Sequence, residues 1–575
     1  MIRRLLRRVA VLIPFACAGC SSDPGNDPGT VLTTPADLSN CTSANTVPIT
    51  LAVGGSQVFD ASQINCLALP GGTAAQEYVV EAYSGYGVST ENGSSAAYAL
   101  QSVKDSTAPV AGATAESVRQ LAAAWHLPGA TATTVRAAGF DHHLRTLERG
   151  LIQNPLVRAS HLMATPTAVP VLGDRDSFYV CSDANCDGFK RIGATVKYVG
   201  APGIIYLDDQ VDPKAEQLVA ADFEQLGSIF DGYLYPTDTT AFGRESDING
   251  DGHIAILMTP SVNALTPDCT DGRVIGYTFA NDLLPYAPGS NAREMFYTYV
   301  PSVATAKCNV VTRADAIEGL QPTLIHELQH MISFNQHVLL LPGNDQDTWM
   351  NEGLSHFAEE LGYRTVPTSQ CTTFTGGDCF SVFAGGDIEN AYSYLSDTES
   401  EYLIAPEAGD ADLAQRGASW LFIRWVADHF ASDTLLGTQF TRAMEQSTVL
   451  GAARVAQFTG VDFPTLVGEW HLATWTDDLP GFPQTGLLNY RTWDFRDLYA
   501  ANYPDNFSRI YPLIPDLIGT GTYNHSGVLN AGSGRTVRFE LPAGSPGYTI
   551  RMAGDVQGDA LLPAILPYLA VVRVQ

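Results

Sequence analysis

Residues 322–363 decide the fold, and they read PTLIHELQHMISFNQHVLLLPGNDQDTWMNEGLSHFAEELGY. The first part has apolar residues at helical spacing, and its proline lies near the expected first turn. The apolar stripe consists of Leu324, Ile325, Leu328, Met331 and Ile332. His326 and His330 then lie one turn apart on the other face of this predicted helix.

The segment 326–330, HELQH, is a HExxH motif. Two imidazoles at i and i+4 are spaced to bind one Zn²⁺, and Glu327 lies beside the metal as a general base. A catalytic zinc takes three protein ligands and leaves one position open. Glu352, on a second predicted helix, is the expected third ligand. The sequence therefore predicts a zinc centre formed by His326, His330 and Glu352.

The paired segments HELQHMISF and WMNEGLSHFAEEL resemble the gluzincin metallopeptidases, most closely the hyicolysin-type peptidase family. The NEG segment is also similar to that of zinc aminopeptidases. The resemblance covers about forty residues at motif level and extends weakly from roughly residue 170 to 480. It implies an α+β, zincin-like catalytic domain, with the same three zinc ligands and Glu327 as the catalytic base.

The resemblance also raises two questions about supporting residues. Thermolysin-like enzymes have an aspartate four residues after the third ligand, where this chain has His356. Glu359 or Glu360 could replace that carboxylate, which normally orients a ligating imidazole. Gluzincins usually add a Tyr or His that stabilises the oxyanion, and the candidates here are Tyr402 and Arg416.

Composition limits the possible partners. The chain has 575 residues, 61 acidic against 32 basic, and a net charge of −29. Two to four domains are expected at this length. Nucleic acid is excluded as a partner because phosphate binding needs clustered Lys and Arg. We expect a monomer that acts on protein or peptide substrates.

The N-terminal residues 1–20 predict export. Four arginines precede an apolar run that ends in the small residues AGC, and the run is too short for a permanent membrane span. AGC-SS resembles a bacterial lipobox, with Cys20 as the lipidated first residue of the mature protein. The prediction is a lipoprotein at the cell envelope, attached to the membrane through Cys20; simple secretion is the alternative.

Eight cysteines remain after removal of Cys17 and lipidation of Cys20, an even number that suits an oxidising compartment. Sequence alone leaves the connectivity open, but the spacings favour local pairs. These pairs are Cys41 with Cys66, Cys181 with Cys186, Cys269 with Cys308, and Cys371 with Cys379.

The chain divides into six predicted parts. They are a lipoprotein signal peptide (1–20), a flexible tether (21–40), a β-sandwich-like module (41–110), a helical connector or inhibitory prosegment (111–167), the zincin metallopeptidase domain (168–485) and a C-terminal β domain (486–575). Helical patterns are expected at 115–126 and 140–152. We interpret His142-His143 as a solvated pair rather than a metal site.

Three further patterns lie in the catalytic domain. Residues 191–209 predict two strands around a Pro-Gly turn, and Asp212-Pro213 is expected to open a helix carrying Val219, Phe223, Leu226 and Phe230 on one face. Residues 413–430 predict a long, mostly buried helix.

A possible calcium site lies at residues 247–254, DINGDGHI. Oxygen side chains at loop positions 1, 3 and 5 with Gly at 6 match the start of an EF-hand loop. The candidate ligands are Asp247, Asn249, Asp251 and His253. The Glu usual at position 12 is replaced by Met258. The alternative is a polar turn before an edge strand.

The sequence is therefore interpreted as an exported zinc endopeptidase. One alternative is a non-catalytic adhesin that keeps a zincin scaffold, although Glu327 would be superfluous there. A zinc aminopeptidase is the other, although AIEGLQ stands at 316–321, where a GAMEN-like amine-binding segment would be expected.

Overall fold

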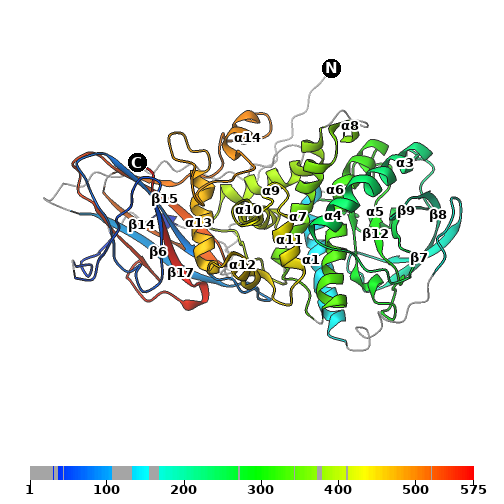
Figure 1. Ribbon diagram of the computed structural model, residues 1–575, viewed down its shortest axis with the longest axis horizontal. Helices are drawn as coiled ribbons and strands as arrows, with labels where there is room; N and C mark the ends of the chain where they lie inside the picture. The colour runs from blue at the N-terminus through cyan, green and yellow to red at the C-terminus, as the bar shows by residue number, and fades with distance from the viewer. Residues whose placement is uncertain are drawn as a thin grey trace, which may run out of the picture.

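The computed structural model describes residues 30–31, 36–42, 44–105, 132–154, 167–269, 272–341, 343–371, 378–408, 412–519 and 521–575. The predicted signal peptide, Cys20 and the helix expected at 115–126 lie outside these ranges. Figure 1 shows a β sandwich at one end of the molecule, helices in the middle and a second sheet at the other end. The expected α+β class is confirmed.

The second sheet, called the mixed sheet below, has the strand order β11-β12-β10-β9-β8-β7. Its strands are β7 (Arg175–Cys181), β8 (Phe189–Val199), β9 (Gly203–Asp208), β10 (Ile254–Met258), β11 (Gly276–Tyr277) and β12 (Met295–Thr298). The predicted pair at 191–209 is confirmed as β8 and β9, which run antiparallel. β9, β10 and β12 are parallel, while β11 is antiparallel to β12 and forms one edge of the sheet.

Several short helices accompany this sheet. They are α3 (Ala220–Ile229), η2 (Phe230–Leu234), α4 (Tyr235–Ala241), α5 (Pro260–Ala264) and η3 (Ala280–Leu283). The prediction that a helix opens at Asp212-Pro213 is wrong. Asp212 Oδ1 accepts the Lys214 N–H at 2.8 Å and closes a turn instead, and α3 starts only at Ala220. The predicted apolar face is buried except for Val219, which precedes the helix.

The helix that carries HExxH is α6 (Arg313–Phe334), so the expectation that it starts at Pro322 is wrong. Thr312 caps it: its Oγ1 accepts the Asp315 N–H at 3.0 Å, and Asp315 Oδ2 accepts the Thr312 N–H at 2.9 Å. Such a capping box satisfies the first free donors of a helix, which fixes its start upstream of the proline. Pro322 therefore lies inside α6.

The predicted apolar stripe of α6 is buried as expected. The helix continues into η4 (Asn335–Leu340) and is followed by α7 (Thr348–Thr365), which packs against it. Trp349, Met350 and Leu354 of α7 are buried in the same hydrophobic core. The two segments of the initial stretch thus form one packed helix pair.

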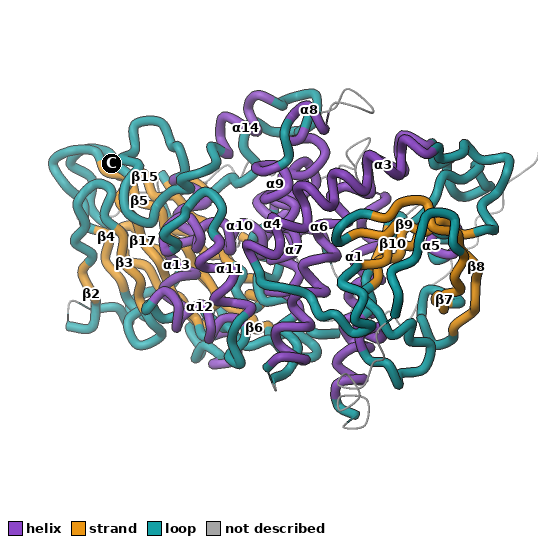
Figure 2. The backbone as a smooth tube through the Cα atoms, turned by 45° about the vertical axis from the view of Figure 1, so that its right-hand side comes forward, coloured by secondary structure: helices purple, strands orange, loops and turns teal. Residues whose placement is uncertain are grey.

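The remaining helices build the middle of the molecule (Figure 2). They are α8 (Thr368–Cys371), η5 (Phe380–Ala384), α9 (Gly385–Ser396), α10 (Leu413–Phe430), α11 (Thr438–Glu445), α12 (Gly451–Thr459), α13 (Phe463–Thr476) and α14 (Phe495–Ala501). The long helix predicted at 413–430 is confirmed as α10, and Trp420, Phe422 and Trp425 are fully buried on it. No helix in the described ranges is both long and apolar enough to cross a bilayer.

The sandwich combines strands from both ends of the chain. Its sheets have the orders β1-β14-β6-β16-β4-β2 and β13-β15-β5-β17-β3. The strands are β1 (Thr30–Val31), β2 (Val47–Pro48), β3 (Ser56–Phe59), β4 (Leu67–Leu69), β5 (Gln76–Ser84), β6 (Ser95–Lys104), β13 (Asp516–Ile518), β14 (Thr522–Asn530), β15 (Gly534–Leu541), β16 (Tyr548–Ala553) and β17 (Pro567–Arg573); η6 (Pro563–Ile565) precedes the last. β5 lies between β15 and β17, and β6 lies between β14 and β16.

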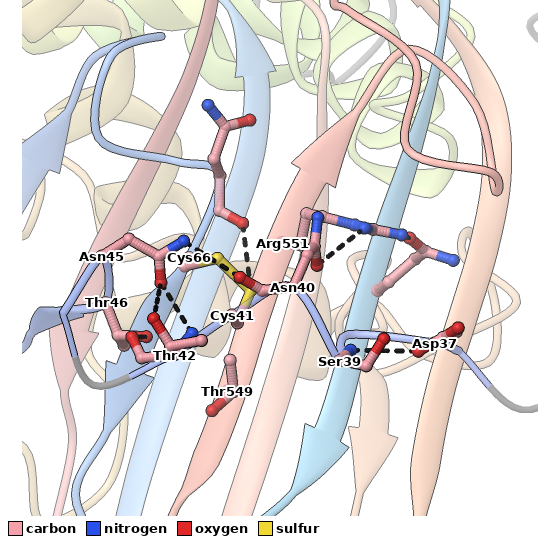
Figure 3. The surroundings of a disulfide bond; sticks show 12 residues. Asp37, Ser39, Asn40, Cys41, Thr42, Asn45, Thr46, Cys66, Thr549 and Arg551 are labelled. Atoms are coloured by element: carbon pink, nitrogen blue, oxygen red, sulfur yellow. Dashed lines mark hydrogen bonds between the residues drawn. A yellow bond between two sulfur atoms is a disulfide. The ribbon is translucent and has the colours of Figure 1, made fainter.

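This pairing differs from the expected separate modules at the two ends. Each of the two long N-terminal strands obtains both of its neighbours from the C-terminal segment. Figure 3 shows the same interleaving near the first disulfide, where Arg551 on β16 reaches Asn40 Oδ1 at 3.4 Å. The two segments share one hydrophobic core, so neither would bury its apolar face alone.

Strand β5 also joins the sandwich to the helices. Tyr78 and Val80 point into the sandwich core, whereas Val79 and Tyr83 belong to the core of the helical region, as expected for alternating faces of a strand. The Tyr83 hydroxyl donates to the carbonyl of Pro464 on α13 at 2.8 Å. Both faces of this strand are therefore covered.

All four predicted disulfides are confirmed: Cys41–Cys66, Cys181–Cys186, Cys269–Cys308 and Cys371–Cys379. Four such bonds are typical of chains that fold in an oxidising compartment. Each joins cysteines that are neighbours in sequence order, so spacing alone was sufficient to find them.

The disulfides are expected to contribute to stability according to the length of the loop they close. Cys41–Cys66 spans 25 residues and Cys181–Cys186 only 5. Replacing the first pair with serines should lower the free energy of unfolding by about 3–4 kcal/mol, and replacing the second by about 2 kcal/mol. Urea unfolding of the two double variants measures both, and equal losses would contradict the loop-length explanation.

Candidate active site

The three predicted zinc ligands converge. His326 and His330 lie on α6 and Glu352 on α7, and their ligand atoms all lie within 4.8 Å of one another. The two Nε2 atoms are 3.2 Å apart, and the Glu352 oxygens lie 3.7 Å from His326 Nε2 and 3.8 Å from His330 Nε2. Ligands of a tetrahedral zinc, each about 2.0–2.2 Å from the metal, are separated by roughly 3.5 Å. The donor set therefore fits Zn²⁺ in both chemistry and spacing.

The protonation states also suit a metal. Burial lowers the pKa of both His326 and His330, so the imidazoles are neutral and have a free lone pair. Burial alone would raise the pKa of Glu352, but the positive charge of the Arg416 guanidinium beside it holds this pKa well below its usual range. Glu352 Oε2 forms a 3.1 Å ion pair with Arg416, and Oε1 accepts no hydrogen bond from a described residue. Such a carboxylate is ready to bind a cation.

The outer nitrogens of the two imidazoles are held by side chains of α7. His326 Nδ1 lies 2.7 Å from Glu359 Oε1, and His330 Nδ1 lies 3.0 Å from Asn351 Oδ1. Each acceptor fixes the proton on Nδ1 and turns Nε2 inward. Glu359 and Glu360 were the two candidates for orienting a ligating imidazole, and Glu359 is the one that contacts His326. Glu360 binds Arg424 and the indole N–H of Trp420 instead.

His356 occupies the position where thermolysin-like enzymes have an aspartate. Its Nδ1 lies 2.8 Å from Asp387 and 3.2 Å from Glu359. Burial opposes protonation, but the two carboxylates raise the pKa of His356 to about 10. A cationic His356 between Asp387 and Glu359 keeps Glu359 ionised, with its pKa lowered to about 2. Sequence reasoning missed Asp387, because α9 approaches α7 only in the folded chain.

Replacing Glu359 with glutamine is expected to weaken zinc binding by roughly 10- to 100-fold, because the charged carboxylate that accepts from His326 Nδ1 becomes a neutral and weaker acceptor. Competition against a zinc-binding dye measures the affinity. Glu389→Gln on α9 is the matched control, since this glutamate is only partly buried and outside the cluster. Unchanged affinity in Glu359→Gln would show that His326 is oriented by other contacts.

Glu327 lies on α6 next to both histidines but faces the mixed sheet. Its Oε2 accepts the main-chain N–H of Thr278, directly after β11, at 2.7 Å. The side chain is only 3% exposed. Burial raises its pKa, and the Asp141 carboxylate raises it further. The carboxylate is thus held beside the ligand set and is not part of it.

The two predicted oxyanion candidates lie in different places. Arg416 on α10 forms a 3.1 Å ion pair with Glu352 and lies 3.6 Å from Asp141. Tyr402 contacts the sandwich end of the molecule, where its ring and hydroxyl lie against Gly93. The structure therefore brings Arg416 to the ligand set and does not show Tyr402 in contact with it.

Helix α1 (Ala132–Ile152) adds charged groups that sequence reasoning missed. Asp141, Arg145 and Glu148 are all buried. The helix predicted at 140–152 is confirmed, but the interpretation of His142-His143 as solvated is wrong for His142, which is 5% exposed. His143 lies near the surface, with Nε2 2.9 Å from the carbonyl of Asn185.

The predicted calcium ligands lie between α4 and β10 and bond to one another. Asp247 Oδ1 accepts the Gly252 N–H at 3.1 Å, and Asn249 Nδ2 donates to Asp251 Oδ2 at 2.6 Å. His253 Nδ1 lies 2.5 Å from the Asp251 carbonyl. The described residues form two groups of clustered metal-ligating atoms, both at His326 and neither in this loop. Calcium binding stays a prediction.

Comparison with known proteins agrees with this geometry. The chain is 28% identical over 226 residues to the neutral metalloprotease ShpI of Staphylococcus hyicus. The aligned residues make up 38% of this chain and 48% of that protein. The chain is related to this metalloprotease. It spans about half the length of the curated relative it matches. The HExxH motif and Glu352 accordingly form a gluzincin-like site.

Two other comparisons add little. No protein-family model matches the chain. A crystal structure of a variant M1 zinc metallopeptidase from Deinococcus radiodurans aligns with 55% of this chain and 54% of its own, at 14% identity and a TM-score of 0.27. That score is too low to carry a conclusion about the fold.

Proposed function

We propose that this protein is a zinc-dependent endopeptidase that hydrolyses peptide bonds with water as the nucleophile. The observation that carries the proposal is the convergence of His326, His330 and Glu352 beside the buried carboxylate of Glu327. Zinc at such a site supplies a Lewis acid that polarises a carbonyl and makes water nucleophilic at neutral pH. Proton transfer and oxyanion stabilisation are the proposed tasks of the protein side chains.

Glu327 is the proposed general base. Thr278 fixes one oxygen of its carboxylate, which leaves the other to take a proton from the attacking water and pass it to the leaving amine. Because burial raises the pKa of Glu327, its carboxylate is a stronger base than an exposed one. The site therefore needs no nucleophilic side chain and forms no acyl-enzyme.

Arg416 is the better placed of the two candidates for stabilising the oxyanion. It is a buried cation that contacts the third ligand directly, whereas the contacts of Tyr402 are with the sandwich. In the resting protein Arg416 positions Glu352, and a developing negative charge next to the ligand set would fall within its field. Its role in catalysis is part of the proposal.

Digestion of an unfolded protein, followed by mass spectrometry of the products, tests the function. Cuts at internal bonds that stop on chelation and resume on zinc addition are expected. Stepwise loss of N-terminal residues would favour an aminopeptidase instead. A zinc-loaded protein that cleaves nothing would favour the non-catalytic adhesin with a zincin scaffold.

We also propose that the protein is exported and anchored through lipidated Cys20, with simple secretion as the alternative. The lipobox-like AGC-SS sequence and the four disulfides support this. Cys20→Ser should release the protein from membranes, and a variant that stays bound would exclude this anchor.

A further inference from the structure

Helix α1 lies across the junction between the helical region and the mixed sheet. It contacts α10, which carries Arg416, and η3, which follows the edge strand β11. Figures 1 and 2 both show α1 beside α6 and α7, where these helices meet the mixed sheet. The helix thus lies over the side of the sheet from which Glu327 is held.

The side chains of α1 bind main-chain groups beyond β11. Arg145 Nη2 donates to the Thr278 carbonyl at 2.8 Å, and Glu148 Oε1 accepts the Ala280 N–H at 2.7 Å. The two side chains also form a 3.1 Å ion pair with each other. All of these groups are buried.

An extended peptide would need the outward main-chain groups of this edge, of which α1 holds the Thr278 carbonyl and Glu327 holds the Thr278 N–H. Tyr299 on the β12 side donates its N–H to the Ile275 carbonyl at 2.9 Å, so Ile275 faces the neighbouring strand. Alternate residues of an antiparallel strand point their main-chain groups in opposite directions, which directs Gly276 and Thr278 outward. Peptides commonly bind by adding a strand to such an edge. Here a helix occupies it.

One turn before Arg145, Asp141 brings a carboxylate into the active site. Its Oδ2 lies 3.6 Å from Arg416, whose other nitrogen pairs with Glu352. A peptide bond under attack must lie between Glu327 and the metal ligands, and the Asp141 side chain reaches this neighbourhood from α1.

The apolar face of α1 packs on the same edge. Phe140 stacks edge-to-face on Tyr277 of β11 at 5.2 Å, and Leu144 is fully buried in the core of the mixed sheet. These apolar contacts hold α1 against the edge of the mixed sheet. The sequence predicts that residues 111–167 form either a helical connector or an inhibitory prosegment.

We propose that α1 is an autoinhibitory segment that occupies the substrate cleft and must leave it before an extended peptide can bind along β11. The inference rests on the proposed peptidase function. Because only molecules with α1 displaced can bind substrate, the apparent affinity falls by the fraction that is displaced. Weakening the hold of α1 should therefore raise activity.

The first test uses the full-length chain with Glu327→Gln, loaded with zinc, and the oxidised insulin B chain as the peptide. Hydrogen exchange is followed at residues 140–152 and 276–280. Bound peptide is expected to increase exchange in α1 while 276–280 stay protected. Peptide binding that leaves α1 fully protected would overturn the inference and leave the peptidase function intact. Absence of peptide binding in every variant would overturn both.

The second test compares Arg145→Ala with Thr146→Ala in the otherwise unchanged chain. Arg145 holds the Thr278 carbonyl, whereas Thr146 is the exposed neighbour on the same helix. Cleavage of the insulin B chain is expected to rise about tenfold or more in Arg145→Ala and to match the parent protein in Thr146→Ala. A slower Arg145→Ala that keeps its zinc and melting temperature would instead make α1 part of the catalytic framework. Should Arg145→Ala fail to fold, the exchange experiment alone decides.

Discussion

Glu327→Gln is expected to lower peptide cleavage by at least about 10²- to 10⁴-fold, the usual cost of a missing general base, while zinc content stays near that of the parent protein. Glutamine has the same shape, and its amide oxygen can still accept the Thr278 N–H that holds Glu327 at 2.7 Å. The amide cannot take a proton from water. Cleavage rate and metal content are measured on the same purified sample.

Glu318→Gln is the matched control for this change. Glu318 lies on the same helix, is partly buried and is outside the ligand set. It should cleave at the parent rate. If Glu327→Gln lost its zinc together with its activity, Glu327 would have to be counted as a ligand and the assigned roles would be wrong.

Glu352→Ala is expected to lose zinc itself, and activity with it. The change removes one of three converging ligands, so the affinity should fall by more than the roughly 10- to 100-fold that follows loss of an outer partner. Competition against a zinc-binding dye measures this. The change also leaves Arg416 without its 3.1 Å partner, so the melting temperature is recorded alongside.

Glu389→Ala controls for removal of a carboxylate from the same region. Zinc bound as tightly by Glu352→Ala as by this control would show that the third ligand is another residue. A lower melting temperature in Glu352→Ala with unchanged zinc affinity would show that Glu352 stabilises the fold by pairing with Arg416 and does not bind zinc.

The helix pair and the convergence of its candidate ligands could be predicted from sequence, because the determinants lie within one short stretch. The i, i+4 spacing of His326 and His330 places both on one face of any helix that contains them. Glu352 followed from the requirement for a third ligand. The start of α6 differs from the prediction because the Thr312–Asp315 capping box, and not Pro322, fixes the first turn.

The joint sandwich could not be predicted, because strand patterns carry no information about distant partners. β5 and β6 have clear alternating patterns, yet their neighbours lie more than 400 residues later in the chain. The same reason applies around the active site. Asp387, Asp141 and Arg145 lie on other helices and contact the groups that surround the ligand set, namely His356, Arg416 and the Thr278 carbonyl, and no spacing in the sequence marks them.

Anomalous diffraction at the zinc absorption edge, from crystals of the full-length protein grown with zinc, tests the central claim most directly. The account predicts one strong peak about 2.0–2.2 Å from His326 Nε2, His330 Nε2 and a Glu352 oxygen, with Glu327 outside this shell. A peak centred on other residues, or no peak at these three ligands in crystals whose fold is intact, would contradict it.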